Sequence, residues 1–237
     1  MKWCMLMRVE FRDLGRVPYA DCWEMQLRLF DLLLERKRDS QRERSGYILF
    51  VEHPPVYTLG KSGKRENMLI SEEYLKKLGA EFYHIDRGGD ITFHGEGQIV
   101  GYPILDLEGC GIGLRDYIYS LEEAIIRTIA HYGLTGERIE GASGVWLKQP
   151  GCPPRKICAI GVRSSRFITM HGFAFNVSTD LKWFQYINPC GFSDRGVTSL
   201  EGEVGHPVDM DEVKSLLLSN LEKILKIEIY KKQRLCP

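Results

Sequence analysis

Hydrophobic and polar positions in the first fifty residues change from a strand pattern to a helix pattern and back. Met7–Leu14 alternates with a period of two, which predicts a strand. After Pro18, apolar residues recur at helical spacing and predict a helix, and the charged stretch Glu35–Arg44 predicts a solvated loop. The apolar run Tyr47–Val51 predicts a buried strand. The residues expected on the buried stripe of the helix are Trp23, Leu27, Phe30 and Leu34.

The rest of the chain mixes strands with helices. Ser71 before two glutamates predicts a capped helix that ends at Gly79, and the apolar spacing from Tyr117 predicts a long helix that ends at Gly133. Several strand pairs are joined by loops too short for a crossover helix, so we expect an α+β fold with a mixed, mostly antiparallel sheet flanked by helices. The other expected elements are strands over Glu81–Asp86, Ile99–Leu107, Gly144–Leu147, Lys156–Val162 and Phe167–Val177, and helices over Thr179–Tyr186 and Asp209–Ile227.

Composition narrows the class of protein. The 237 residues carry no internal repeat or linker-like segment, so we expect one domain over residues 1–237. The 32 basic residues balance 32 acidic ones, which argues against a nonspecific nucleic-acid partner. Apolar runs are far shorter than the ~20 residues that cross a bilayer, so no membrane partner is expected. Seven scattered cysteines and a charged N-terminal segment favour reduced thiols in the cytoplasm.

The glycine-rich segment Arg87–Gln98 is the strongest local signal for a ligand site. Its four glycines allow the backbone to approach a ligand closely, and its guanidinium, hydroxyl and imidazole groups suit a carbonyl, a carboxylate or a reacting acyl group. The structural alternative is a glycine hairpin. The segment lacks the Lys-Ser/Thr pair of a phosphate-binding loop and the spacing of a dinucleotide-binding loop.

Three further side chains are candidates for chemistry. Cys190 follows Asn188 and Pro189 in a predicted turn, where a thiol can be an exposed nucleophile or a bystander. Lys156 begins an otherwise apolar strand; its side chain either reaches solvent or, beside a thiol, favours the thiolate and accepts a proton. His171 fits a structural histidine as well as a site residue, and Cys158 fits the core.

Four segments of the sequence resemble the signature blocks of octanoyltransferase, the LipB family of lipoate biosynthesis, and occur in the same order along the chain. The resemblance runs from about Val9 through Leu200, and it implies a fold similar to the catalytic domain of biotin and lipoate protein ligases. The loop after Leu147 is longer than in many members. The four segments are Arg87–Gln98, Lys156–Gly161, His171–Val177 and Asn188–Gly191.

The resemblance implies an acyltransferase of protein lipoylation. Such an enzyme moves an octanoyl group from octanoyl-acyl carrier protein to one lysine of a lipoyl domain, as in the E2 subunits of 2-oxoacid dehydrogenases and in the glycine cleavage H protein. The family pattern makes Cys190 the nucleophile that carries the acyl thioester and makes Lys156 the residue that lowers the thiol pKa and relays a proton. Because the donor is already a thioester, neither ATP nor a metal is expected.

The same blocks imply a substrate-binding set. His171 and Gly191 are expected in supporting positions. An acidic carrier protein is expected to be steered by basic residues at the mouth of the site. The expected substrate-binding residues are Arg87, Gly88, Gly89, Asp90, Ile91, Thr92, Phe93, His94, Ala159, Ile160, Gly161, Gly172, Phe173 and Ala174. The expected basic residues are Lys61, Lys64, Arg65, Arg163 and Arg166.

Four other functions compete with this one. A ligase that adenylates a free acid needs no nucleophilic cysteine, and the sequence lacks a ligase-type Gly-Arg-Gly-Arg run. An amidotransferase that takes octanoyl groups from H protein would also use a cysteine, so only donor assays separate it. An acyl-binding scaffold without activity is disfavoured by the presence of Lys156 and Cys190. A zinc module is disfavoured by the isolated spacing of its ligands, which would be Cys152, Cys158, His171 and Cys190.

Overall fold

A nine-stranded sheet forms the centre of the protein. The structure, a computed structural model, describes residues 6–38, 45–188 and 195–231. β1 runs parallel to β12 and β2, and β11 (Gly196–Val197) runs parallel to β9, whereas the other pairs are antiparallel. The expected mixed, mostly antiparallel sheet is therefore confirmed. The strand order is β12 (Ile227–Lys231), β1 (Met7–Arg16), β2 (Ser45–Glu52), β6 (Gln98–Ile104), β10 (Ile168–Asn176), β9 (Arg155–Ser165), β8 (Ala142–Leu147) and β7 (Glu137–Ile139).

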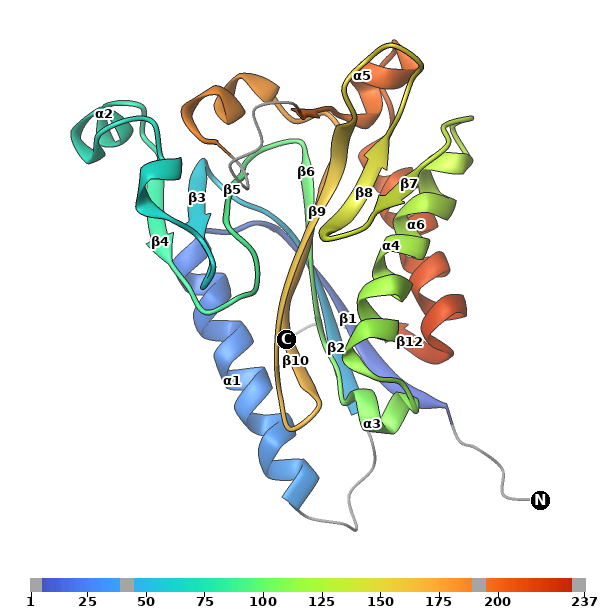
Figure 1. Ribbon diagram of the computed structural model, residues 1–237. Helices are drawn as coiled ribbons and strands as arrows, with labels where there is room; N and C mark the ends of the chain where they lie inside the picture. The colour runs from blue at the N-terminus through green and yellow to red at the C-terminus, as the bar shows by residue number, and fades with distance from the viewer. Residues whose placement is uncertain (1–5, 39–44, 189–194, 232–237) are drawn as a thin grey trace, which may run out of the picture.

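Helices cover both faces of this sheet (Figure 1). α1 (Tyr19–Arg38) lies on one face and encloses a core cluster that includes Leu29, Leu49 and Met170. α4 (Leu114–Ala130) and α6 (Met210–Leu225) lie side by side on the other face, over a larger apolar cluster. The short helices α3 (Leu107–Cys110) and α5 (Leu200–Val204) complete this layer. The sheet is thus buried on both sides, which explains why β6 and β10 are buried at every position.

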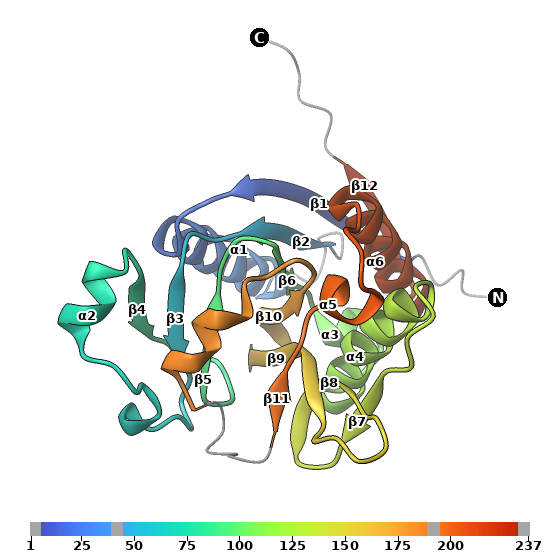
Figure 2. The same cartoon turned by 90° about the horizontal axis from the view of Figure 1, so that it is seen from above.

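A second, three-stranded sheet lies beside the main one, at the left of Figure 2. β3 (Val56–Leu59) pairs with β4 (Glu81–His84) and with β5 (Ile91–His94). Phe93 of β5 stacks on Trp183 at 5.3 Å between ring centroids and forms the centre of its core. Around this sheet lie η1 (Arg65–Asn67), α2 (Glu72–Lys77) and η2 (Leu181–Tyr186).

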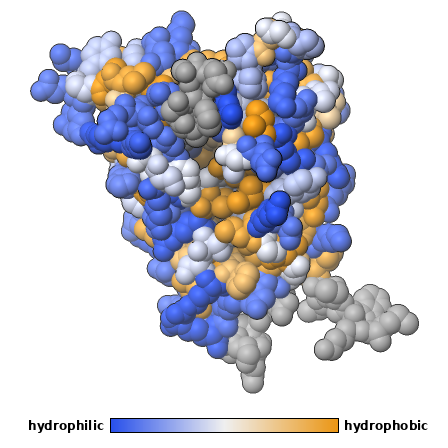
Figure 3. Space-filling view, in the orientation of Figure 1, coloured by the Kyte–Doolittle hydropathy of each residue, from blue (hydrophilic) through white to orange (hydrophobic). Residues whose placement is uncertain are grey.

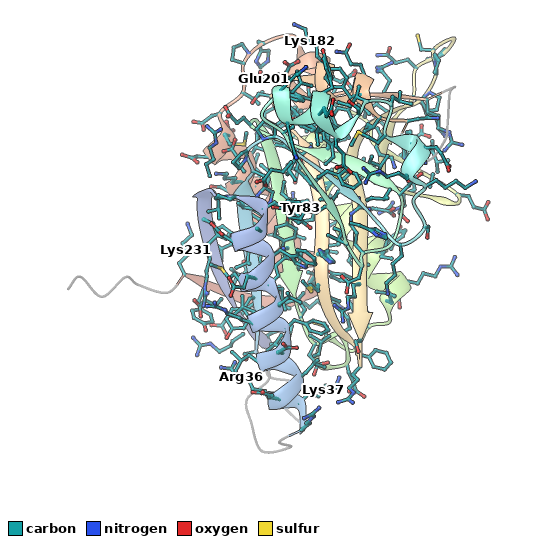
Figure 4. All side chains as sticks on the ribbon, turned by 90° about the vertical axis from the view of Figure 1, so that its left-hand side faces the viewer. Arg36, Lys37, Tyr83, Lys182, Glu201 and Lys231 are labelled. Carbon is teal, nitrogen blue, oxygen red and sulfur yellow. The ribbon has the colours of Figure 1, made fainter. Side chains whose placement is uncertain are left out.

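The contact between the small sheet and α1 is aromatic. Tyr19, at the start of α1, lies 5.2 Å from Tyr83 of β4 and 5.3 Å from His53, between ring centroids. Figure 4 shows Tyr83 near this end of the helix, whereas Arg36 and Lys37 lie at the opposite end. The small sheet is therefore held to the main one at the N-terminal end of α1.

The structure corrects three details of the helices expected from the sequence. In α1, Trp23, Leu27 and Leu34 are only half-buried, and the buried face is centred on Cys22, Gln26 and Leu33. The buried side-chain oxygen of Gln26 is satisfied by a hydrogen bond from the backbone N–H of His171 in β10, at 3.2 Å. The charged stretch begins as helix rather than loop, since α1 continues through Arg38 and Lys37 pairs with Asp106 at 2.8 Å. The segment expected as a helix over Thr179–Tyr186 forms the 3₁₀ helix η2.

Four of the seven cysteines lie in the described ranges. Cys22, Cys110, Cys152 and Cys158 are free thiols, and Cys158 is fully buried as expected. Within residues 6–38, 45–188 and 195–231, no helix combines the length and apolar character that a bilayer crossing requires.

Candidate active site

A cavity of about 330 Å³ opens between the two sheets. Its walls come from the segment before and through β5, from the edge of β9, from β10 and from the first turns of α4. Figure 3 shows hydrophobic residues exposed near the middle of the face that it draws, with mostly hydrophilic residues on either side. Among the apolar lining residues are Leu114, Ile118, Ile160 and Val162. A mostly apolar cavity with polar groups at a few points is the usual form of a small-molecule site.

The cavity brings together three sequence segments that the resemblance singled out. Every expected substrate-binding residue except Phe93 lines it, and so do Lys156 and His171. Phe93 is instead 1% exposed in the core of the small sheet, because side chains along β5 alternate and Phe93 points away from the face that carries Thr92 and His94. Gln98 and Asn176, which end or lie within two of the segments singled out from the sequence, also line the cavity. The lining residues outside those segments are Tyr19, Ile85, Val100, Tyr102, Leu114, Ile118, Gly141, Ala142, Ser143, Val162, Phe184 and Val197.

The Arg87–Gly89 segment is docked directly on the edge of β9. The backbone N–H of Gly88 donates to the carbonyl of Val162 at 2.9 Å. A methyl group at Gly161 would lie 2.7 Å from the Gly88 carbonyl oxygen, so glycine is required for this close approach. The buried Arg87 guanidinium donates to the backbone carbonyl of Thr58 at 2.7 Å and to its hydroxyl at 3.0 Å. These contacts fix one wall of the cavity.

Hydrogen bonds fix the protonation state of His94. Its Nδ1 lies 3.0 Å from Oε1 of Gln98, whose amide nitrogen donates to Asn176 at 2.8 Å, so Nδ1–H is the donor. Its Nε2 then accepts from the Thr58 hydroxyl at 3.2 Å. Burial, with further repulsion from His53 and Arg87, holds the pKa of His94 well below its ordinary value. His94 is therefore a neutral, fully engaged wall residue.

His171 lies in the cavity wall with an unusual backbone conformation. Its φ is +61°, in the left-handed region that residues with a side chain rarely adopt. Nε2 donates to the Asp86 carboxylate at 3.0 Å, and Asp86 also pairs with Arg163. Burial lowers the pKa of His171 although Asp86 acts in the opposite direction. The hydrogen bond from His171, reinforced by Arg163, lowers the pKa of Asp86. The pair is thus a neutral imidazole held by a carboxylate.

Lys156 lies at one end of the cavity, near the start of β9. Its Nζ donates to the backbone carbonyl of Ser143 at 3.1 Å and lies 4.5 Å from the centroid of the Trp146 ring. Lys156 also lines a second cavity of about 280 Å³. Asn188 and Arg195 line this second cavity as well. The predicted residues Cys190 and Gly191 lie outside the described residues, between these two positions.

The five basic residues expected at the mouth occupy different places. None of them lines the cavity. Lys61 adjoins it, because its backbone N–H donates to the Arg87 carbonyl at 2.9 Å. Arg163 pairs with Asp86 and lies over the Phe30 ring at 5.0 Å. Arg166 is in the β9–β10 turn, at the opposite end of β9 from Lys156. Lys64 and Arg65 are exposed near η1.

The described residues also bear on the zinc alternative. In the ranges given above, no three His, Cys, Asp or Glu side chains gather where they could hold a metal ion. Cys158 is fully buried and Cys152 is exposed, and His171 already donates to Asp86. These placements do not favour a shared metal site.

Comparison with known proteins agrees with the expected fold and family. The model of the lipoyl protein ligase A/B catalytic domain matches residues 18–222. An octanoyltransferase from Parabacteroides distasonis is 57% identical over 88% of this chain and 95% of its own length, and one from Bacteroides fragilis is 56% identical over 86% and 92%.

A solved structure shows the same fold at low sequence identity. The bipartite lipoate protein ligase from Thermoplasma acidophilum superimposes with a TM-score of 0.71 at 17% identity, covering 96% of this chain and 87% of that one. This confirms the expected α+β fold of the ligase catalytic domain. The family match and the octanoyltransferase relatives show that the chain belongs to the octanoyltransferase family of acyltransferases, which shares the catalytic domain of lipoyl protein ligases A and B.

Proposed function

We propose that this protein transfers an octanoyl group from octanoyl-acyl carrier protein to a specific lysine of lipoyl domains, including the glycine cleavage H protein, through a thioester on Cys190. The observation that carries the proposal is the convergence of three distant segments, before β5 and on β9 and β10, on one apolar cavity that Lys156 also lines. Relatives more than 50% identical and named octanoyltransferase support the same activity.

The first half-reaction is a thioester exchange. The Cys190 thiolate attacks the acyl carbonyl of the carrier thioester, a new carbon–sulfur bond forms, and the bond to the carrier sulfur breaks. Lys156, as the ammonium, delivers its proton to the departing carrier thiolate. Because one thioester replaces another, this step requires neither activation of the acyl group by ATP nor a metal ion.

The second half-reaction forms the amide. The acceptor lysine amine attacks the acyl-Cys190 carbonyl, and the neutral Lys156 amine takes the proton that the attacking nitrogen loses. The cysteine thiolate leaves and the enzyme returns to its starting state. Aminolysis of a thioester runs downhill, which makes the transfer effectively one-directional.

Lys156 suits the proton-transfer role better than the histidines in the cavity wall. His94 uses both ring nitrogens in hydrogen bonds to Gln98 and Thr58, and burial keeps it neutral. His171 donates to Asp86, and burial lowers its pKa too. Both rings therefore serve as fixed walls rather than proton carriers.

The apolar lining suits a medium-length acyl chain. Each methylene removed from water contributes ~0.8 kcal/mol, so Leu114, Ile118 and Val162 can hold several methylenes of the tail. Discrimination between neighbouring chain lengths is then modest, about 1–3 kcal/mol per methylene. We place the reaction in the cytoplasm, where the four free thiols of the described ranges remain reduced.

The test is a transfer assay with purified protein and a lipoyl domain. Octanoyl-acyl carrier protein should support acceptor octanoylation equally with and without ATP. Free octanoate with ATP should support none. Octanoyl-H protein serves as a third donor, and preference for it would indicate the amidotransferase reaction instead. Transfer that occurs only from free octanoate with ATP would make the protein a ligase.

A further inference from the structure

One peptide group connects Lys156 to a carboxylate on another element. The carbonyl of Ser143 accepts from Lys156 Nζ at 3.1 Å. The N–H of the same peptide unit belongs to Gly144 and donates to Oε1 of Glu122 at 3.0 Å. A peptide is planar and its N–H and C=O point in opposite directions. Glu122 therefore accepts from the N–H of the same peptide whose carbonyl accepts from the Lys156 ammonium.

The orientation of this peptide depends on Gly144. Its φ is +119°, a conformation that a residue with a side chain rarely adopts, and a methyl group there would collide with the backbone carbonyl of Cys158. Glycine permits several orientations of the adjoining peptide planes, so the local chain alone does not select the one observed. The pairing of Gly144 with Ala159 of β9 and the hydrogen bond to Glu122 together hold the observed orientation.

Glu122 is itself held rigidly. It projects from α4, is 7% exposed, and its Oε2 accepts from Arg138 Nε of β7 at 3.1 Å. Arg138 also lies over the Tyr119 ring, 3.7 Å from its centroid, and donates to Glu123 at 2.7 Å. The carboxylate is thus a buried, paired charge that accepts from Gly144 near the start of β8.

We propose that Glu122 is a positioning residue for Lys156, acting through the Ser143–Gly144 peptide. The negative charge on the N–H side polarises the peptide and strengthens its carbonyl as an acceptor for the ammonium. Glu122 touches no reacting atom in this scheme. The inference rests on the proposed role of Lys156 in acyl transfer, and its structural part concerns only the placement of the lysine.

Glu123 offers a matched control. It is the next residue on α4 and pairs with the same Arg138, and also with Arg127 at 2.9 Å. The Glu123 carboxylate accepts from Arg127 and Arg138, whereas the Gly144 N–H donates to Glu122. If Glu122 only fastens the β7–β8 hairpin to α4, then removing either carboxylate should have similar effects.

Steady-state kinetics test the proposal. Glu122→Ala should lower kcat about 10- to 100-fold with little change in KM, because one hydrogen bond to a charged network is lost at the lysine rather than in substrate binding. Glu122→Gln keeps an acceptor for the Gly144 N–H and should recover most of the loss. Glu123→Ala should stay within about twofold of the unchanged protein. Equal losses for Glu122→Ala and Glu123→Ala, or wild-type kcat in Glu122→Ala, would overturn the proposal.

A labelling experiment separates this inference from the proposed function. The folded variants are treated with trinitrobenzenesulfonate, which modifies neutral amines, and modification of the Lys156 peptide is followed by mass spectrometry. Glu122→Ala should speed labelling of Lys156 about 3- to 10-fold, whereas Glu122→Gln and Glu123→Gln should stay near the unchanged protein. Unchanged labelling in all variants contradicts the inference whatever the activity. If labelling is faster but the protein transfers no octanoyl group, the result supports the link between Glu122 and Lys156 and rejects the proposed function.

Discussion

The Lys156 ammonium lies over the ring of Trp146, its cross-strand neighbour on β8, at 4.5 Å from the ring centroid. The Trp146 indole N–H donates to the Ala142 carbonyl at 3.0 Å, and the residue is 3% exposed, so the ring cannot turn away. Arg195 lies 5.4 Å from the same ring. An aromatic face attracts a cation and holds it in place. The position of the proposed proton carrier is therefore set by β8.

Replacing Trp146 should weaken transfer through Lys156. Trp146→Leu removes the aromatic face, and we expect kcat to fall about 3- to 30-fold, which corresponds to the usual strength of such a contact. Trp146→Phe keeps an aromatic face and should lose less. Thermal unfolding of both variants, measured beside the kinetics, separates this effect from the cavity left in the core. Equal kcat values for Leu and Phe would show that the ring does not act on the ammonium.

Gly161 is predicted to tolerate no side chain. In Gly161→Ala the added methyl would meet the Gly88 carbonyl at 2.7 Å and the Arg87 side chain at 3.1 Å, so the wall segment must move. We expect the free energy of unfolding to fall by about 1–3 kcal/mol, measured by urea unfolding. We also expect a marked drop in octanoyl loading, measured by mass spectrometry. Gly113→Ala is the control, because its methyl approaches only Asp116, at 3.8 Å. Normal loading of Gly161→Ala would place the acyl chain elsewhere.

Stability should decline in mild acid because a buried histidine must stay neutral. His53 Nδ1–H donates to the Val17 carbonyl at 2.7 Å and Nε2 accepts from the Tyr102 hydroxyl at 2.8 Å. Burial lowers the pKa of His53 from 6.5 to about 4. The unfolded chain thus binds the proton first, and the stabilisation present above pH 6.5 is lost as the pH falls toward 4.

The expected size of this effect is about 2 kcal/mol between pH 7 and pH 5 from His53 alone. His94 and His171, whose pKa values are also lowered by burial, act in the same direction. Urea unfolding at the two pH values should show a smaller difference in His53→Gln than in the unchanged protein. His206→Gln, at an exposed position, should leave the difference as it was. A pH-independent free energy of unfolding from pH 7 to 5 would refute this account.

Reversing the charge of Lys61 should slow capture of an acidic carrier protein. Lys61 is exposed beside the Arg87 segment of the cavity wall. In Lys61→Glu we expect kcat/KM for octanoyl-acyl carrier protein to fall about 3- to 10-fold at low ionic strength, with a smaller difference as salt screens the charges. Arg28→Glu, on the exposed side of α1, is the control. A kcat/KM that changes neither with salt nor in Lys61→Glu would exclude electrostatic steering by Lys61.

Hydrophobic patterning was sufficient for the long elements and insufficient for the short ones. β1, α4 and α6 follow from clear periodicity and β2 from a continuous apolar run, and the structure confirms all of them. β3 has only four residues after a Pro-Pro pair, and its burial is decided by pairing with β4 and β5. Four residues carry too little periodicity to separate a strand from a loop.

For the site, local sequence located the polar segments but not the surfaces that close the cavity. Leu114 and Ile118 look like ordinary positions on an amphipathic helix, and their role as cavity walls comes from how α4 lies against the edge of β9. Phe93 belongs to the expected substrate-binding set but lies in the core of the small sheet, away from the cavity wall. The alternation of Thr92, Phe93 and His94 could have shown that Phe93 faces the other way.

The most direct test of the central claim is to find where the octanoyl group rests on the enzyme. The protein is incubated with octanoyl-acyl carrier protein without an acceptor, quenched in acid, digested and mapped by mass spectrometry, with Cys190→Ser and Cys152→Ser in parallel. We predict one octanoyl thioester on Cys190, absent from Cys190→Ser, retained in Cys152→Ser, and lost when a lipoyl domain is added. An adduct on another residue, or full transfer activity in Cys190→Ser, would contradict the account.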